Sequence, residues 1–365
     1  MASITTPKTA VVTGPSAFTP RQTRLAVLNL TPAAGASTAS VNSVLNSIFV
    51  MRDLLLKLSV TVQFGATAPV AGDIKPGDEW GIISNINLNK NGGIQLWNST
   101  GEVLAVFNYL TGRKTRIVPA NLRTLPAANA AATFTSTLSL PRKMFNSTKP
   151  LDFSLNCNIQ NQVGLNVSTN PLTAFLSTAG ATLTSVKLTV YQDAAAPNNP
   201  SNQPEFTDWS FESRQVAFSG ASSLTDLLLP PTRIYRAVLF GGKASGAVGA
   251  ADSNILNELR VMPQGLETEH FYDIDTLQSM WYDEFRLVPS VDLPFANTSW
   301  NPAAWAAIDF AKYKYLTESY NTVGYTSVGI EAGTSGAGTL NVFPVLIYPT
   351  QVVSTNKPAA AATAA

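Results

Sequence analysis

Apolar and polar residues alternate along several segments of the chain, and this period of two constrains the fold more than any other feature. In residues 56–64 every second side chain is apolar and the residues between are polar. Successive side chains of a β-strand point to opposite faces, so this segment predicts a strand with one buried face. The alternation returns in residues 151–159, where Cys157 lies on the apolar face. We therefore expect Cys157 to be a small buried side chain rather than a reactive thiol.

Further strands are predicted on both sides of a proline-rich break. Before it they are residues 82–89, 94–97, 103–109, 133–140, 163–167 and 182–192, with a turn at 91–93 between the first two. Residues 193–204 (DAAAPNNPSNQP) have three prolines and no apolar period, so they predict a linker. After it the predicted strands are 209–218, 233–240, 256–262, 312–316, 323–330 and 339–348. The GTSGAG segment, residues 333–338, is expected to join the last two as a hairpin loop.

Two short helices are predicted, both after the linker. Asp273 or Asp275 can cap a helix whose apolar residues recur at helical spacing up to about Leu287. A second helix is expected to begin at Asn301, with Pro302 at its first position. Because no long helix separates the predicted strands, the pattern does not indicate a parallel sheet.

These patterns divide the chain into two all-β units. We expect an N-terminal arm over residues 1–47, a first unit over 48–203, a second unit over 204–350, and a disordered tail over 351–365. The arm is rich in Ala, Ser, Thr and Pro, and its apolar residues are scattered. Its charged residues, which we expect to contact a neighbouring subunit or a membrane, are Lys8, Arg21 and Arg24.

The composition excludes several classes of protein. Charged residues make up 13% of the chain, and 24 Lys and Arg against 23 Asp and Glu leave a net charge of +1. This balance is not that of a basic DNA-coating protein, and with 45% hydrophobic residues the chain is not intrinsically disordered. A neutral surface of Asn, Ser, Thr, Gly and Ala suits a protein that packs against many copies of itself. The N-terminus has no secretory signal pattern, so we expect synthesis as a soluble protein in the cytoplasm.

Few residues in the chain are suited to catalysis or metal binding. A single cysteine rules out an intrachain disulfide, and a single histidine, His270, removes most hydrolase arrangements. His270 has four acidic neighbours, which could bind a cation through their oxygens or simply favour the start of a helix. We prefer the second interpretation. The acidic residues are Glu267, Glu269, Asp273 and Asp275.

Cofactor and nucleic-acid signatures are also missing. Residues 241–243 (GGK) follow a predicted strand, but they lack the first glycine of a phosphate-binding loop and a following helix, so we expect a simple loop. The six tryptophans are dispersed and are expected to lie in the core rather than on a stacking surface. No basic stripe accompanies them, which disfavours sequence-specific nucleic-acid binding. We therefore assign no catalytic, cofactor or metal residues and do not expect an enzyme.

Four segments resemble one family of viral proteins. They are SVKLTVYQ (residues 185–192), residues 232–261, DTLQSMWYDEFR (residues 275–286) and residues 313–348. In element order, most of residues 48–350 is similar to the double jelly-roll major capsid proteins of tailless, membrane-containing icosahedral double-stranded DNA phages, the tectivirus-like group. The resemblance implies two tandem eight-stranded jelly-roll β-sandwiches, with one or two short helices inserted in the second. The arm departs from the family because it lacks an obvious long, charged N-terminal helix.

The resemblance also implies a function. The chain would be a major capsid protein of the virion, forming homotrimers with a pseudo-hexagonal outline that tile an icosahedral shell around an internal membrane and a DNA genome. Its partners would be other copies of itself, other capsid proteins such as pentons, and the inner viral membrane. The main alternative is a carbohydrate- or receptor-binding β-protein such as a spike, fibre or lectin. An enzyme with a β-sandwich or β-helix core is a third alternative.

Overall fold

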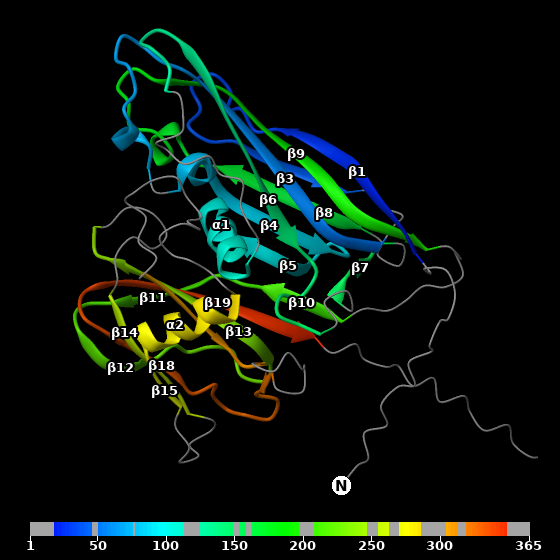
Figure 1. Cartoon of the computed structure of the whole chain (residues 1–365), viewed down its shortest axis with the longest axis vertical. Helices are drawn as coiled ribbons and strands as arrows, with labels where there is room; N and C mark the ends of the chain where they lie inside the picture. Colours follow the sequence, from blue (N-terminus) through cyan, green and yellow to red (C-terminus); the bar gives the residue numbers. More distant parts are fainter. Residues whose placement is uncertain are drawn as a thin grey trace, which may run out of the picture.

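Two β-sandwiches follow one another along the longest axis of the molecule (Figure 1). The computed structural model describes residues 18–45, 50–75, 77–112, 125–148, 153–157, 162–197, 207–246, 255–262, 270–285, 304–311 and 319–348. Strands of the first sandwich lie in the upper half of Figure 1, and those of the second lie below them.

Three sheets build the two sandwiches. The first outer sheet has the order β1 (Phe18–Asn29), β9 (Thr182–Pro197), β3 (Val50–Gln63), β6 (Ala131–Pro141), with the short β7 (Leu155–Asn156) beside β3. The second outer sheet has the order β12 (Ser222–Asp226), β18 (Ile330–Thr334), β14 (Leu256–Val261), β15 (His270–Asp273).

A ten-stranded sheet, here called the shared sheet, runs through both sandwiches. Its order is β16 (Trp305–Asp309), β13 (Ile234–Ala244), β19 (Gly338–Tyr348), β10 (Asp208–Phe211), β5 (Ile94–Ser99), β4 (Ile83–Lys90), β8 (Val163–Thr169), β2 (Ser40–Val44), with β11 (Arg214–Phe218) beside β19 and β17 (Tyr320–Asn321) beside β13. The half from β5 to β2 packs on the first outer sheet, and the half from β10 to β16 packs on the second.

Both sandwiches have the same topology. We number the strands of each sandwich from its own first strand, leaving out the short β7 and β17 and counting β10 and β11 as one strand. In this numbering both sandwiches have one sheet in the order 1-8-3-6 and a second sheet in the order 2-7-4-5. A helix follows the fifth strand in each: α1 (Gly101–Leu110) in the first and α2 (Ile274–Phe285) in the second. This is the strand order of the jelly roll. The prediction of two tandem eight-stranded jelly rolls is therefore confirmed.

Residues 18–45 of the predicted arm belong to the first roll, which corrects that prediction for this segment. β1 and β2 are the first two strands of the roll and pair with β9 and β8. A bulge in β1 between Arg24 and Ala26 interrupts the alternation, so the sequence does not show a clear period of two there. Leu28 and Leu30 are nevertheless buried in the core. Residues 1–17, the predicted boundary at 203 and 204, and the predicted tail lie outside the described residues.

The predicted strand at residues 103–109 is wrong, because this segment forms helix α1. The Thr100 hydroxyl accepts a hydrogen bond from the Val103 amide at 3.2 Å and caps the helix. All ten residues of α1 are buried, so no polar face marks a helical period. A short apolar run of this kind cannot be distinguished from a buried strand by periodicity. The first roll therefore also contains a helix, contrary to the expectation that helices occur only in the second.

Helix α2 agrees with the sequence prediction, and Asp273 rather than Asp275 is its cap. The Asp273 carboxylate accepts a hydrogen bond from the Thr276 amide at 3.1 Å. The predicted helix start at Asn301 lies outside the described residues, but residues 305–309 form β16 instead of continuing a helix. Three short 3-10 helices complete the described helices: η1 (Ala71–Asp73), η2 (Asp78–Ile82) and η5 (Leu172–Ala174).

The connections differ from the sequence predictions in three places. Residues 193–197 of the predicted linker continue β9, because they pair with β1 on one side. The GTSGAG segment is not a hairpin loop, since β18 and β19 belong to different sheets and the chain crosses between them. Residues 241–243 lie inside β13 rather than in a loop. Residues 323–329 are not a strand, and residues 312–316 lie outside the described part of the chain.

The side chains predicted to lie in the core are buried there. Cys157 is 6% exposed, in agreement with its predicted role as a small apolar residue. Of the six tryptophans, Trp300 lies outside the described residues. The other five are at most 5% exposed: Trp80, Trp97, Trp209, Trp281 and Trp305. They stabilise the fold by burial and do not form an exposed stacking surface.

Helix α1 protects an open edge of the first outer sheet. β6 is the last strand of that sheet, and Asn108 of α1 lies against it. The Asn108 side-chain amide donates a hydrogen bond to the Ser139 carbonyl at 2.7 Å, and its oxygen accepts one from the Ser139 amide at 3.2 Å. The side chain thus replaces one residue of a neighbouring strand, which satisfies two edge groups and blocks pairing with another chain.

We expect Asn108→Ala to lower the free energy of unfolding by about 1–3 kcal/mol, because both Ser139 groups lose their partner. Chemical denaturation with urea measures the loss. Thr135→Ala on the exposed face of β6 removes one solvent-accessible hydrogen bond to Ser59 and is the control, with an expected change within about 0.5 kcal/mol. Equal losses in the two variants would contradict the proposed role of Asn108.

Candidate functional site: the junction between the two rolls

The described residues contain no cluster suited to metal chemistry. No group of three or more His, Cys, Asp or Glu side chains in that part of the chain could hold a metal ion. The side chains of His270, Glu267 and Glu269 lie outside the described set, and Asp273 caps α2. No helix among the described residues is long and apolar enough to cross a membrane. Among the described residues, buried charged and aromatic side chains gather at the junction between the rolls.

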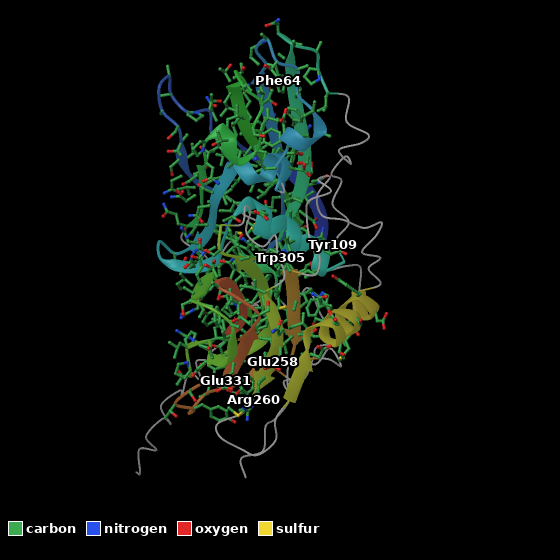
Figure 2. All side chains as sticks on the ribbon, turned by 90° about the vertical axis from the view of Figure 1, so that its left-hand side faces the viewer. Phe64, Tyr109, Glu258, Arg260, Trp305 and Glu331 are labelled. Atoms are coloured by element: carbon green, nitrogen blue, oxygen red, sulfur yellow. The ribbon has the colours of Figure 1, made fainter. Side chains whose placement is uncertain are left out.

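The shared sheet crosses this junction through a single parallel contact. β10 pairs with β19 of its own roll in antiparallel fashion and with β5 of the first roll in parallel fashion, where Phe211 lies opposite Trp97. Tyr109 of α1 and Trp305 of β16 lie at the level where the rolls meet (Figure 2). The backbone contact is short, so side chains must fix the relative position of the rolls.

Aromatic rings from both rolls stack at this point. Trp97 stacks on Phe211 with ring centroids 4.3 Å apart, and Phe211 stacks on Phe343 at 5.6 Å. Phe107 of α1 meets Trp97 edge to face at 5.0 Å and Phe211 at 5.1 Å. Each such pair contributes about 0.5–1.5 kcal/mol beyond the burial of its surface. The rings therefore join β5 and α1 of the first roll to β10 and β19 of the second.

A buried arginine and a tryptophan bind each other's backbone across the junction. Arg142, which follows β6, donates from Nη2 to the Trp209 carbonyl at 3.0 Å, and Trp209 Nε1 donates to the Arg142 carbonyl at 2.7 Å. The guanidinium carbon lies 4.9 Å from the centre of the indole ring. Burial lowers the pKa of Arg142 to about 10, while the charges of Asp208 and Asp53 oppose the shift. Arg142 remains a cation at neutral pH.

A second buried arginine belongs to the second roll and binds the segment of the first roll that follows β6. Arg236 of β13 forms an ion pair with Asp309 of β16 and donates from Nη2 to the Asn146 carbonyl at 2.8 Å. The Asn146 side-chain amide donates to Asp309 at 3.2 Å, and Phe145 lies under the guanidinium at 5.2 Å. The segment after β6 is thereby held to two strands of the second roll.

The two helices and one further ion pair complete the junction. Trp281 of α2 donates from Nε1 to the Leu110 carbonyl at the end of α1, at 2.7 Å. Lys90 at the end of β4 forms an ion pair with Asp208 at the start of β10. The junction contacts thus involve several elements of each roll, so together they oppose movement of one roll against the other.

Residues of both rolls line an open pocket of about 700 Å³. Lys75 and Thr100 of the first roll and Lys243 and Ser213 of the second are among its lining residues. Because charged and hydroxyl side chains line it, this pocket leaves part of the interface between the rolls polar.

The structure places one of the three predicted contact residues completely. Arg24 is exposed on β1, opposite Tyr191 of β9, and is not part of the junction. The backbone of Arg21 lies in β1, while its side chain and all of Lys8 lie outside the described residues. Sequence reasoning missed the junction arginines. A signal was present for Arg236, which interrupts the apolar segment 234–240, where an unpaired charge would be costly. Arg142 lies beside Lys143 in a mixed segment, and its sequence neighbourhood gives no such signal.

The chain was compared with known families, curated sequences and solved structures. No protein-family model and no curated protein sequence matches it. The crystal structure of the STIV MCP is similar over 92% of this chain and 99% of that chain, with 14% sequence identity and a TM-score of 0.67. A chain in the atomic structure of Sulfolobus turreted icosahedral virus matches over 90% of both chains, with 13% identity and a TM-score of 0.65.

The major capsid protein P2 of bacteriophage PM2 is a third similar structure. It matches over 90% of this chain and 97% of that chain, with 11% identity and a TM-score of 0.50. At these identities the likeness shows a common fold. It extends over nearly the whole length of both chains, so the shared feature is the pair of rolls rather than one roll alone.

The junction predicts an asymmetry between single and double substitutions at the Arg236–Asp309 pair. Arg236→Met leaves the Asp309 carboxylate, which is 11% exposed, without its cation, and we expect it to lower the free energy of unfolding by up to about 3–5 kcal/mol. Arg236→Met combined with Asp309→Leu removes both charges, so part of this loss should be recovered. Denaturant unfolding of the two single variants and the double variant measures the coupling. Strictly additive losses would contradict a buried pair.

Proposed function

We propose that the chain is a major capsid protein, whose function is to build an icosahedral shell from many copies of itself. The observation that carries the proposal is the pair of jelly rolls with one topology, fused through the shared sheet and similar over about 90% of the chain to viral capsid structures. A shell subunit acts by its shape and its contacts rather than by a reaction. The proposed role is therefore structural and not enzymatic.

The junction supports this role because a shell needs subunits of one fixed shape. Buried arginines and stacked rings hold the two rolls in a single relative position. Three copies of a two-roll subunit around an axis present six similar rolls, and such a trimer has a pseudo-hexagonal outline. Hexagonal outlines tile a surface with few gaps. We therefore propose the homotrimer as the building unit.

The outer face of the first outer sheet also suits packing against copies. Hydroxyl groups of neighbouring strands bond to one another there, Ser59 to Thr135 at 3.2 Å and Thr61 to Thr133 at 3.0 Å. Hydroxyls on an exposed sheet face can also form hydrogen bonds across an interface. The low content of charged residues supports the same interpretation.

The remaining parts of the proposal follow from the family resemblance. We propose that the shell belongs to a virion with an internal membrane and a double-stranded DNA genome, that other capsid proteins such as pentons complete it, and that the chain is made in the host cytoplasm. Arg24, on the exposed side of β1, supports a contact with a neighbouring subunit or the membrane. Lys8 and Arg21 are proposed to take part in the same contact.

A carbohydrate- or receptor-binding protein is the alternative, and no particular observation favours it. Such proteins commonly stack sugars on exposed aromatic rings. All five tryptophans in the described part of the chain are buried instead.

The proposal predicts a trimer that assembles. The purified chain should elute as a single species with about three times its 38.8 kDa mass, as measured by size-exclusion chromatography with light scattering. Electron microscopy of concentrated protein or of the source particle should show hexagonal units in a curved lattice. A monodisperse monomer that binds sugars and forms no lattice would refute the capsid role.

Deletions at the N-terminus separate folding from assembly. Deletion of residues 2–17 should leave a folded trimer, because β1 begins at Phe18, but closed particles should no longer form if the predicted arm connects subunits or reaches the membrane. Deletion of residues 2–40 also removes β1 and buried Leu28, so it should prevent the first roll from folding. Circular dichroism and electron microscopy of both variants distinguish the two effects. Normal particles from the shorter deletion would rule out the arm contact.

A further inference from the structure

Because the two rolls have the same topology, each surface of one roll has a corresponding surface on the other. Some of these corresponding surfaces are buried in one roll and exposed in the other. The half of the shared sheet from β10 to β16 corresponds to the first outer sheet, because both have the strand order 1-8-3-6. The second roll's half carries Leu239, Phe343 and Val345 on a face that belongs to the same core cluster as the first roll. The corresponding face of the first outer sheet carries exposed Lys57 and Lys187. One face is covered within the subunit, and its counterpart is open.

The two helices show the same difference. Helix α1 is buried along its whole length at the junction, where Phe107 contacts rings of the second roll. Helix α2 holds the corresponding place in the second roll, yet it has an exposed stripe that includes Asp275, Met280 and Asp283. In Figure 1, α2 lies at the lower left, while β1 and β9 of the first outer sheet lie at the upper right. Within one subunit, no third roll exists to cover α2 as the second roll covers α1.

The open sheet face is basic. Lys57 lies between buried Leu56 and Leu58, so its side chain points away from the core, and Lys187 points the same way from the neighbouring strand β9. Arg24 of β1 is exposed as well. The described strands of this sheet contain two carboxylates, and both are paired with cations at one end. These ion pairs are Arg52 with Asp193 at 2.6 Å and Lys143 with Asp53 at 3.1 Å.

The open helix face is acidic. Asp275, Asp283 and Glu284 are exposed on α2, and the helix contains no Lys or Arg. Asp273, at the start of the helix, adds a further exposed carboxylate and lies opposite Glu258 of β14. Figure 2 shows Glu258 on the second roll, far below Phe64 of the first. The acidic face is thus on the second roll and the basic face is on the first.

We propose that the acidic face of α2 in one subunit binds the basic face of the first outer sheet in a second copy of this chain. Within a subunit, α1 of the first roll packs on the β10–β16 half of the shared sheet. The proposed contact is the equivalent one between subunits, because α2 corresponds to α1 and the first outer sheet corresponds to that half of the shared sheet. Because it joins two different surfaces, the contact is heterologous, and three copies related by a three-fold axis would close into the proposed trimer. The inference rests on the proposed function and adds to it the surfaces and charges that set the order of the rolls.

Charge reversal tests the contact. Asp275→Lys with Asp283→Lys places cations opposite cations, and Lys57→Glu with Lys187→Glu places anions opposite anions. Each of these two double variants should have a dissociation constant of the oligomer at least about tenfold higher than the wild-type chain, as measured by light scattering at low salt. All four substitutions together should restore oligomers. Glu212→Lys, a reversal at a partly exposed acid elsewhere on the second roll, is the matched control and should leave the oligomer intact.

The outcomes separate this inference from the proposed function. Thermal unfolding of each variant checks that the rolls remain folded, as expected for exposed positions. If the wild-type chain forms trimers and both reversals leave them unchanged, or if the fourfold variant fails to reassociate while still folded, the contact is wrong and the capsid role stands. If the wild-type chain itself remains monomeric and builds no lattice, the proposed function fails together with the contact. Screening by high salt should reduce the difference between each reversal and the wild-type chain.

Discussion

The structure depends on how the two rolls are joined, because the backbone contact between them is so small. One parallel pairing, Phe211 opposite Trp97, continues the sheet from β10 to β5. A two-strand contact of this length would bend easily if it stood alone. Stacked rings on both sides of it and hydrogen bonds from Arg142 to Trp209 make the junction part of the core. The two rolls consequently share one hydrophobic cluster that passes from the first outer sheet to β13, β16 and β19.

The junction arginines set the geometry rather than simply adding stability. A buried ion pair gains little over a well-packed apolar pair of the same volume, since both charges lose their hydration. It does impose direction, because Arg236 satisfies Asp309 and the Asn146 carbonyl in one arrangement of the two rolls. The pair therefore selects one relative position of the two rolls rather than adding much to the free energy of unfolding.

Because the topology is duplicated, helix α1 of the first roll has a counterpart in helix α2 of the second, and the two helices differ in how far they are buried. Helix α1 is covered by the second roll of its own subunit, and its sequence is apolar throughout. Helix α2 holds the same place in the other roll and keeps a polar stripe. Because no other roll of the same subunit covers the outer side of α2, its carboxylates stay solvated, whereas α1 is covered by the second roll. The chemistry of each helix therefore follows from whether the fold of one subunit covers it.

Local sequence patterns were sufficient to predict the class of fold and many of its strands and helices. β3 and β9 each have one buried face and one polar face, and β19 is mostly apolar and is bounded by turn residues. Local patterns therefore identify all three strands. Helix α2 has one buried face and a capping Asp273, so its sequence also predicts it correctly. Tertiary structure alone decided the rest. Helix α1 lacks a polar face because two rolls enclose it, β1 lost its alternation to a bulge, and β18 and β19 enter different sheets because the fold assigns their partners. The junction was hidden for the same reason: Arg142 and Trp209 are 67 positions apart, and only the folded chain brings them together.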